Sequence, residues 1–190
     1  MDFRLFRAVN RLADHTGWAH SLLADYAKYG IVLFPVLMLL AYFEARRGPV
    51  AVLRVARTIW SGVAALIAFG VNQVIGNAVD RARPYATHPG VHVLVSRTHD
   101  FSFPSDHTTV TAAIGVALLL ASRRIGAVAA VLAVLMAFVR VYVGAHYPGD
   151  VLAGLVVGGV VGGAGWFIAR PLLVPVVQAV TRRVPVLVAR

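Results

Sequence analysis

The sequence contains no cysteine, and only 8 of its 190 residues are acidic, against 18 lysines and arginines. Without cysteine the chain can form neither disulfides nor thiolate metal sites, and any covalent catalysis needs a nucleophile other than a thiol. Residues 1–15 lack the unbroken apolar stretch of a signal peptide, so we expect no segment to be removed there. The sequence also shows no internal repeat and no low-complexity linker, which predicts a single domain over residues 1–190.

Hydrophobic residues make up 59% of the chain, and the mean hydropathy is +0.76. These values are typical of a membrane protein and not of a soluble domain. A net charge of +10 would suggest nucleic-acid binding in a soluble protein, but here the arginines lie mostly in short clusters between apolar stretches. That pattern is the one that sets membrane topology. We therefore expect a membrane protein without a nucleic-acid partner.

Five apolar stretches approach the roughly 20 residues that a helix needs to cross a bilayer. They lie at about 29–45, 57–79, 108–122, 125–144 and 151–170. Residues 1–27 mix large apolar side chains with arginines, which favours a helix lying in the membrane interface. The last 20 residues hold three prolines and three arginines, and we interpret them as a helix end followed by an interfacial tail. The sequence thus predicts an all-α membrane helix bundle of about five to six spans with an N-terminal interfacial helix.

Arginine clusters predict the orientation of this bundle. They comprise Arg46, Arg47, Arg54 and Arg57 in one loop, Arg123 and Arg124 in another, and Arg170, Arg182 and Arg183 after the last span. With five spans all three clusters fall on one side, which the positive-inside rule makes cytoplasmic. Residues 80–107 and 140–150 then lie together on the extracytoplasmic side. The cations Arg4, Arg7, Arg11 and Lys28 would also lie outside, a conflict that a sixth crossing or a re-entrant entry would remove.

Glycines recur at every fourth position of the last apolar stretch, at Gly154, Gly158 and Gly162. Such a stripe of small residues lets a second helix approach closely. Packing within one chain is favoured, with a homodimer as the alternative.

One polar cluster begins the third apolar stretch, in the sequence FPSDHTT at residues 103–109. Proline, serine and aspartate before a long apolar run predict a helix start, where free backbone N–H groups attract an anion. Capping by Ser105 or Asp106 would explain those two residues completely. It does not explain His107, which adds a titratable proton donor at the same helix end.

A second cluster, RVYVGAHYPGD at residues 140–150, follows the fourth stretch. Because proline suits the first turn of a helix, Pro148 places Asp150 inside the last helix and His146 just before it. At this spacing a carboxylate can reach the imidazole, hold its tautomer and raise its basicity. The alternative is a capping aspartate beside an interfacial histidine, but similar residue types in both clusters favour the catalytic interpretation.

The third element is DRARPY at residues 80–85, at the outer end of the second span. Arg83, together with Arg140, could supply the forked donors that match phosphate oxygens, whereas a solvated loop position is the better interpretation for Arg81. Three amides on the preceding helix, Asn72, Gln73 and Asn77, are expected to line the bundle interior. The irregularly spaced His88, His92 and His99 are interpreted as loop residues and not as a metal site.

These elements in this order (RP, then PSDH, then R-x5-H-x3-D) resemble the type 2 phosphatidic acid phosphatase superfamily of membrane lipid phosphatases, over about residues 70–155. The resemblance implies a helical bundle of about six spans that requires neither a metal nor another cofactor. It implies that His146 attacks phosphorus to form phosphohistidine, that Asp150 orients it and that His107 protonates the leaving oxygen. Arg83, Arg140 and Ser105 would bind the phosphoryl oxygens. The part of the chain that carries the motifs is expected at about residues 57–170.

The chain departs from the family pattern at Gly76, where a lysine usually lies seven residues before the arginine, and at Val139, where serine is common. Arg81 could substitute for the missing lysine as a phosphate ligand. Asp106 in place of the commoner glycine is similar to the bacterial undecaprenyl-diphosphatase branch.

We therefore expect a multi-pass enzyme of the bacterial inner membrane that converts undecaprenyl diphosphate to undecaprenyl phosphate on the outer face, for cell-wall synthesis. Phosphatidic acid or phosphatidylglycerol phosphate are the alternative substrates. An alternative of another class is a transport or binding protein whose histidines relay protons, but the polar groups cluster at one interface and not through the midplane.

Overall fold

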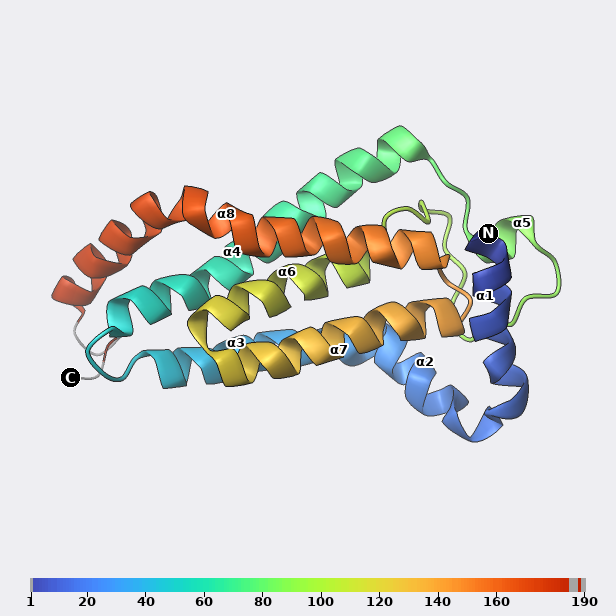
Figure 1. Ribbon diagram of the computed structural model, residues 1–190, viewed down its shortest axis with the longest axis horizontal. Coiled ribbons are helices and arrows are strands. Elements are labelled where there is room, and N and C mark those ends of the chain that lie inside the picture. Colours follow the sequence, from blue (N-terminus) through green and yellow to red (C-terminus); the bar gives the residue numbers. More distant parts are fainter. Residues whose placement is uncertain (1, 185–187, 189–190) are drawn as a thin grey trace.

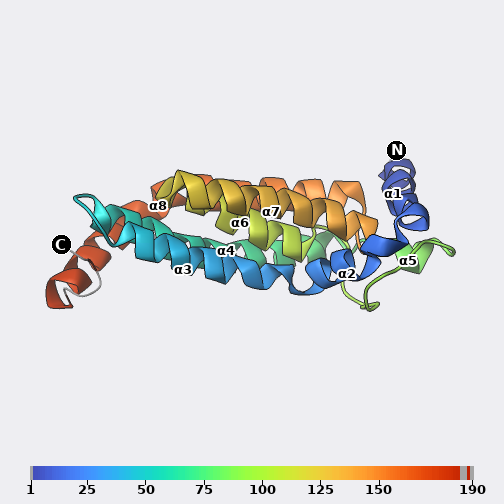
Figure 2. The same cartoon turned by 90° about the horizontal axis from the view of Figure 1, so that it is seen from below.

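The computed structural model of the protein describes residues 2–184 and 188, and this part of the chain is built from helices. They are α1 (Asp2–Asn10), α2 (His20–Tyr29), α3 (Leu33–Ala45), α4 (Ala51–Val79), α5 (Pro84–Thr87), α6 (Asp106–Ala121), α7 (Arg123–Tyr142) and α8 (Pro148–Arg183). The long helices run side by side, while α1 and α5 lie at one end of the bundle (Figures 1 and 2). The predicted all-α membrane bundle is confirmed.

Four helical stretches are long and apolar enough to cross a membrane: Gly17–Ala45, Ala51–Thr87, Arg123–Tyr142 and Pro148–Arg183. The remaining predicted span, at 108–122, corresponds to α6, which has only 16 residues. Helix α6 contacts α4, α7 and α8, and most of its side chains are buried, so it forms the centre of the bundle. The protein is therefore a multi-pass membrane protein.

The first span begins earlier than predicted. Helix α2 continues through a short turn at Gly30–Val32 into α3, so the apolar helical stretch starts at Gly17 and not near residue 29. Only α1 and the turn that follows it remain of the expected interfacial segment. Helix α1 lies across the end of the bundle (Figure 2), where Phe6 is buried in a cluster with Val141 and Tyr147. The N-terminal segment therefore covers the ends of α7 and α8.

Helix α8 extends beyond the predicted end at residue 170. It continues to Arg183 with Pro171 and Pro175 inside it. A proline inside a helix removes a backbone hydrogen bond and bends the helix, which explains the bend of α8 towards its C-terminal end (Figure 1). Much of the expected interfacial tail lies outside the described residues.

The glycine stripe of α8 packs against α6 within the same chain, as predicted. A Cβ atom added to Gly158 would lie 2.1 Å from the carbonyl oxygen of Thr109, and one added to Gly162 would lie 2.3 Å from that of Ala113. Both distances are far below van der Waals contact, so only glycine allows the two backbones to come this close.

Gly158→Ala is therefore expected to destabilise the bundle by about 1–3 kcal/mol, because the new methyl group forces α6 and α8 apart. Thermal unfolding in detergent would measure the loss. Gly159→Ala is the matched control, since its Cβ would have no neighbour nearer than 3.9 Å. Equal melting temperatures for the two variants would contradict this packing.

The connections that carry the polar motifs gather at the end of the bundle marked by the N-terminus and α5, opposite the C-terminal end of α8 (Figure 1). The opposite end contains the loop between α3 and α4 and the turn between α6 and α7. There Glu44 pairs with Arg54 and accepts a hydrogen bond from Ser122 Oγ at 2.8 Å. The three C-terminal and loop arginine clusters thus lie away from the polar motifs.

Candidate active site

A tight turn between α7 and α8 positions His146. Gly144 adopts a φ of +81°, and an added Cβ would lie 2.1 Å from the carbonyl oxygen of His92, so the turn requires glycine. The loop that precedes α6 is held against this turn by a hydrogen bond from Leu94 N to Val143 O at 3.1 Å. The side chain of His146 is thereby fixed in a buried position, with the residue 1% exposed.

The contacts of His146 define its tautomer. Its Nδ1 atom lies 2.7 Å from the carbonyl oxygen of Ser102, which can only accept a hydrogen bond, so Nδ1 carries the proton. Its Nε2 atom lies 3.1 Å from Arg83 Nη1 and 3.2 Å from Arg140 Nη2, and guanidinium groups can only donate. Nε2 therefore presents a lone pair between two cations.

Electrostatics keep this imidazole neutral. Burial lowers the pKa of His146 well below 6.5, and the charges of Arg140 and Arg83 lower it further, against a smaller opposing effect of the hydrogen bond to Ser102. Since histidine is neutral above its pKa, Nε2 is unprotonated at neutral pH. An unprotonated nitrogen beside two guanidinium groups is suited to attack an electrophile that carries negative charge.

The two arginines are buried and held from different elements. Arg83, just before α5, donates through Nε to Asp100 Oδ1 at 3.0 Å and through Nη1 to the carbonyl oxygen of Ala145 at 3.2 Å. Burial alone would raise the pKa of Asp100, but the hydrogen bond from Thr98 and the charge of Arg83 outweigh it, so this carboxylate stays ionised. Arg140 donates from Nη1 to the carbonyl oxygen of Ala27 at 3.3 Å.

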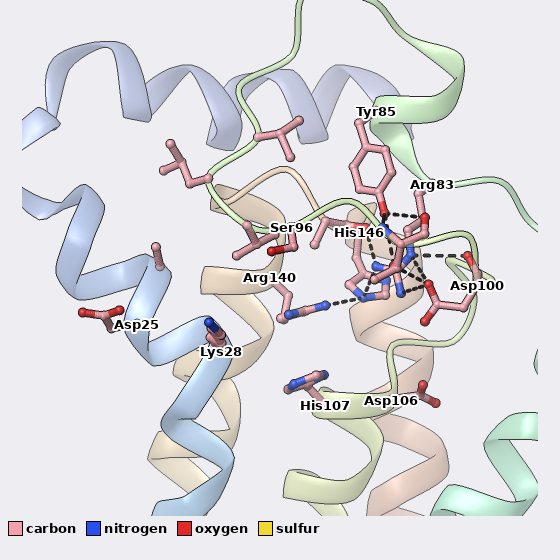
Figure 3. A pocket seen from close by; sticks show the side chains of 16 residues that line it. Asp25, Lys28, Arg83, Tyr85, Ser96, Asp100, Asp106, His107, Arg140 and His146 are labelled. Carbon is pink, nitrogen blue, oxygen red and sulfur yellow. Dashed lines mark hydrogen bonds and ion pairs between the residues drawn. The ribbon is translucent and has the colours of Figure 1, made fainter.

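A cavity of about 640 Å³ opens onto these groups. Its wall includes His146, Arg83, Arg140 and His107, and Figure 3 shows His107 on α6 beside Arg140. The ring of His107 makes no hydrogen bond within the described part of the chain. The structure thus brings together four of the seven site residues that the sequence predicts.

Asp150 does not contact His146 as closely as the sequence suggested. Its Oδ2 atom lies 3.8 Å from His146 Nδ1 and accepts hydrogen bonds from the Tyr147 backbone N–H at 2.9 Å and from Ser102 Oγ. The carboxylate therefore caps α8 and holds Ser102, whose carbonyl oxygen in turn orients the imidazole. Capping by Asp150 is thus confirmed, and its support of catalysis stays a prediction.

Ser105 and Arg81 lie outside the cavity wall. Ser105 is fully buried, and its hydroxyl accepts a hydrogen bond from Thr108 Oγ1 at 3.1 Å, which leaves its own proton to donate. Its contact with phosphate stays a prediction. Arg81 donates to Asp150 Oδ1 and to Asp2 Oδ2, each at 2.7 Å. Both acceptors are carboxylates, and Arg81 does not line the cavity onto which His146 opens.

The amides of α4 support the start of α6. Asn72 is buried and, with Gln73, donates to Asp106 Oδ1 at 2.6 and 2.8 Å. The prediction for Asn77 is wrong: it is exposed and donates to the carbonyl oxygen of Gln73 on its own helix. At Gly76, an added Cβ would lie 3.0 Å from the ring of Phe101, so this ring occupies the direction in which a side chain would extend.

Three residues at the site had no signal in the sequence: Ser102, Asp100 and Lys28. The first two lie in an irregular loop, where no periodicity indicates which groups meet, and Lys28 comes from α2.

Among the described residues no group of three or more His, Cys, Asp or Glu side chains could hold a metal ion. His88 stacks on Phe3, with ring centroids 3.6 Å apart.

Comparison with known proteins agrees with this geometry. The sequence model of a protein family, the PAP2 superfamily, matches residues 57–172. The chain is 31% identical to the undecaprenyl-diphosphatase BcrC of Bacillus subtilis, over 96% of this chain and 91% of that protein. It is 30% identical to an undecaprenyl-diphosphatase of Sulfolobus acidocaldarius, over 81% and 71% of the two chains.

The crystal structure of Aquifex aeolicus LpxE superimposes with a TM-score of 0.63 at 26% identity, covering 85% of this chain and 92% of that one. The predicted resemblance is thus confirmed, because the family match covers more than half of the chain and includes all the polar motifs. This protein belongs to the PAP2 superfamily and is a membrane lipid phosphatase.

Proposed function

We propose that the protein hydrolyses undecaprenyl diphosphate to undecaprenyl phosphate on the extracytoplasmic face of the bacterial inner membrane, through a phosphohistidine intermediate. The observation that carries this proposal is the unprotonated Nε2 of His146, held between Arg83 and Arg140 on the wall of a cavity that also holds His107. A nucleophile, two cations and a separate proton donor are the groups that phosphoryl transfer needs.

In the first step, Nε2 of His146 attacks the terminal phosphorus, and the bond from phosphorus to the bridging oxygen breaks. Burial and the charges of Arg140 and Arg83 lower the pKa of His107 to about 4 in the free enzyme, so His107 takes up its proton together with the anionic substrate. It then gives this proton to that oxygen, and Arg83 and Arg140 move from Nε2 to the phosphoryl oxygens. In the second step, neutral His107 takes a proton from a water molecule, which attacks phosphorus and breaks the P–N bond. Inorganic phosphate leaves, and both histidines return to their starting states.

The outward orientation rests on charge. The polar motifs lie at the end of the bundle opposite the loop and C-terminal arginine clusters, and the positive-inside rule places those clusters in the cytoplasm. The cations of α1 and Lys28 lie at the site end and oppose this rule. Helix α1 contacts α7 and α8 at this end.

The lipid assignment rests on relatives whose names state undecaprenyl-diphosphatase activity and which the chain covers over most of their length. Phosphate release from undecaprenyl diphosphate in detergent, with EDTA present, would test it against phosphatidic acid and phosphatidylglycerol phosphate. We expect metal-independent release that is fastest with the diphosphate. Hydrolysis of the two phospholipids with an intact polyprenyl diphosphate would refute the assignment.

Arg81→Ala is expected to lower kcat about tenfold with little change in KM, because Arg81 positions Asp150 and does not bind phosphate. Arg83→Ala should cost about a hundredfold or more, since it removes a cation that stabilises the transferred group. Steady-state kinetics of both variants would measure the difference, with Arg81→Lys restoring part of the activity. An increase in KM alone for Arg81→Ala would instead support the phosphate-ligand hypothesis.

A further inference from the structure

Lys28 is the only lysine among the 190 residues, and it lies on the wall of the active-site cavity. It comes from the last turn of α2, an element with no part in the three sequence motifs. Figure 3 shows Lys28 on the α2 side of the cavity, with Arg140 between it and His146 and with His107 lower in this view.

Helix α2 is fixed to α7 at the two residues that precede Lys28. Tyr26 Oη donates to the carbonyl oxygen of Leu132 at 2.7 Å, and Arg140 Nη1 donates to that of Ala27 at 3.3 Å. The same guanidinium that contacts His146 therefore also contacts the residue next to Lys28. The lysine backbone is held at a defined position relative to the nucleophile.

The ammonium group of Lys28 is exposed and interacts with the side chain of Tyr29 and with the charge of Asp25. Its Nζ atom lies 4.8 Å from the ring centroid of Tyr29, and it forms no ion pair with a carboxylate in the described part of the chain. Arg83, in contrast, is paired with Asp100, and both arginines face Nε2. Among the described residues of the wall, Lys28 is the one remaining lysine or arginine.

In-line displacement relates this position to the substrate. The leaving oxygen of the substrate lies opposite the attacking atom. Attack by His146 Nε2 on phosphorus therefore expels the leaving group towards the side of the cavity away from His146. When the substrate is a diphosphate, the leaving group is itself a phosphate and needs its own cation. Arg83 and Arg140 cannot supply this cation, because they hold the group that is transferred.

We infer that Lys28 binds the non-transferred phosphate of a lipid diphosphate and thereby favours diphosphates over monophosphates. This inference rests on the proposed function, since it assigns a ligand to the second phosphate of that substrate. Asp25, which lines the same wall, opposes the effect through its negative charge.

The first test compares kcat/KM for undecaprenyl diphosphate and for phosphatidic acid. Lys28→Met should reduce the value for the diphosphate about tenfold more than the value for phosphatidic acid, because only the diphosphate loses a charge-assisted hydrogen bond. Lys28→Arg should keep most of the preference, and Asp25→Asn should increase it. Arg11→Met is the matched control, since Arg11 is an exposed cation at the same end that lines a different hollow.

The second test uses the single lysine directly. An amine-acylating reagent can modify only Lys28 and the N-terminal amine, and mass spectrometry separates the two. A methylene-bridged, non-hydrolysable polyprenyl diphosphonate should protect Lys28, whereas the corresponding monophosphonate should protect it much less. The N-terminal amine provides the internal reference for both ligands.

Equal losses with both lipids in Lys28→Met, or no protection by the diphosphonate, would overturn the inference and leave Lys28 as an anchor at the membrane interface. If wild type hydrolyses the diphosphate, that result affects the inference alone. If wild type hydrolyses only phospholipid monophosphates, the proposed function and the inference fail together.

Discussion

His146→Ala is expected to lower kcat by about four orders of magnitude or more with every lipid phosphate. The substitution removes the nitrogen that would bond to phosphorus, and no other nucleophile of the described chain lies between the two guanidinium groups. Rapid-quench experiments with substrate labelled at the terminal phosphate would show an alkali-stable, acid-labile phosphoenzyme in wild type. The variant should show none.

His99→Ala is the control, because His99 is an exposed loop histidine at the same end that lines a separate hollow. It should retain both turnover and the phosphoenzyme. A His146→Ala variant that still accumulates labelled protein would place the covalent bond on another residue, and the proposed mechanism would be lost.

The same residue predicts a pH profile. A nucleophile must be unprotonated, and burial together with Arg140 and Arg83 lowers the pKa of His146 below 6.5. The fraction of free enzyme with neutral His146 therefore falls only below pH 6.5, and the corresponding acidic limb of kcat/KM is expected there. An acidic limb with a midpoint above pH 6.5 that shifts in Arg140→Met would instead indicate that His146 of the free enzyme is protonated at pH 6.5.

Sequence alone predicts the helical class and the four polar groups of the cavity because each depends on local rules. Apolar length indicates a membrane span, and a proline after a polar cluster indicates a helix start, so His107 and His146 could be placed at helix ends. Once the spans alternate across the membrane, these ends meet. The glycine stripe predicts close helix contact for the same local reason.

The remaining features depend on contacts between distant segments. The carbonyl oxygen of Ser102 contacts His146, which lies 44 positions later in the sequence. Arg81 contacts Asp2 as well as Asp150 because α1 folds over the end of the bundle. Neither contact leaves a period or a spacing in the sequence. The length of α8 was underestimated because two prolines normally end a helix, whereas in α8 they bend it.

His107→Ala is expected to slow phosphoenzyme formation by about two to four orders of magnitude, and by an amount that depends on the leaving group. A leaving alkoxide needs a proton most, a leaving phosphate needs it less, and a nitrophenolate needs it least. The single-turnover rate should therefore fall most with phosphatidic acid, less with undecaprenyl diphosphate and least with nitrophenyl phosphate. Single turnovers isolate this step from the later attack of water.

This ranking separates proton transfer from packing. A purely structural histidine would slow all three substrates by the same factor, because misplacing Arg140 or His146 affects attack on any phosphorus. The ring of His107 has no hydrogen-bond partner within the described chain and lies on the cavity wall, so its removal should leave those two groups in place. The dependence on the leaving group then reports the proton that His107 donates to the oxygen opposite His146.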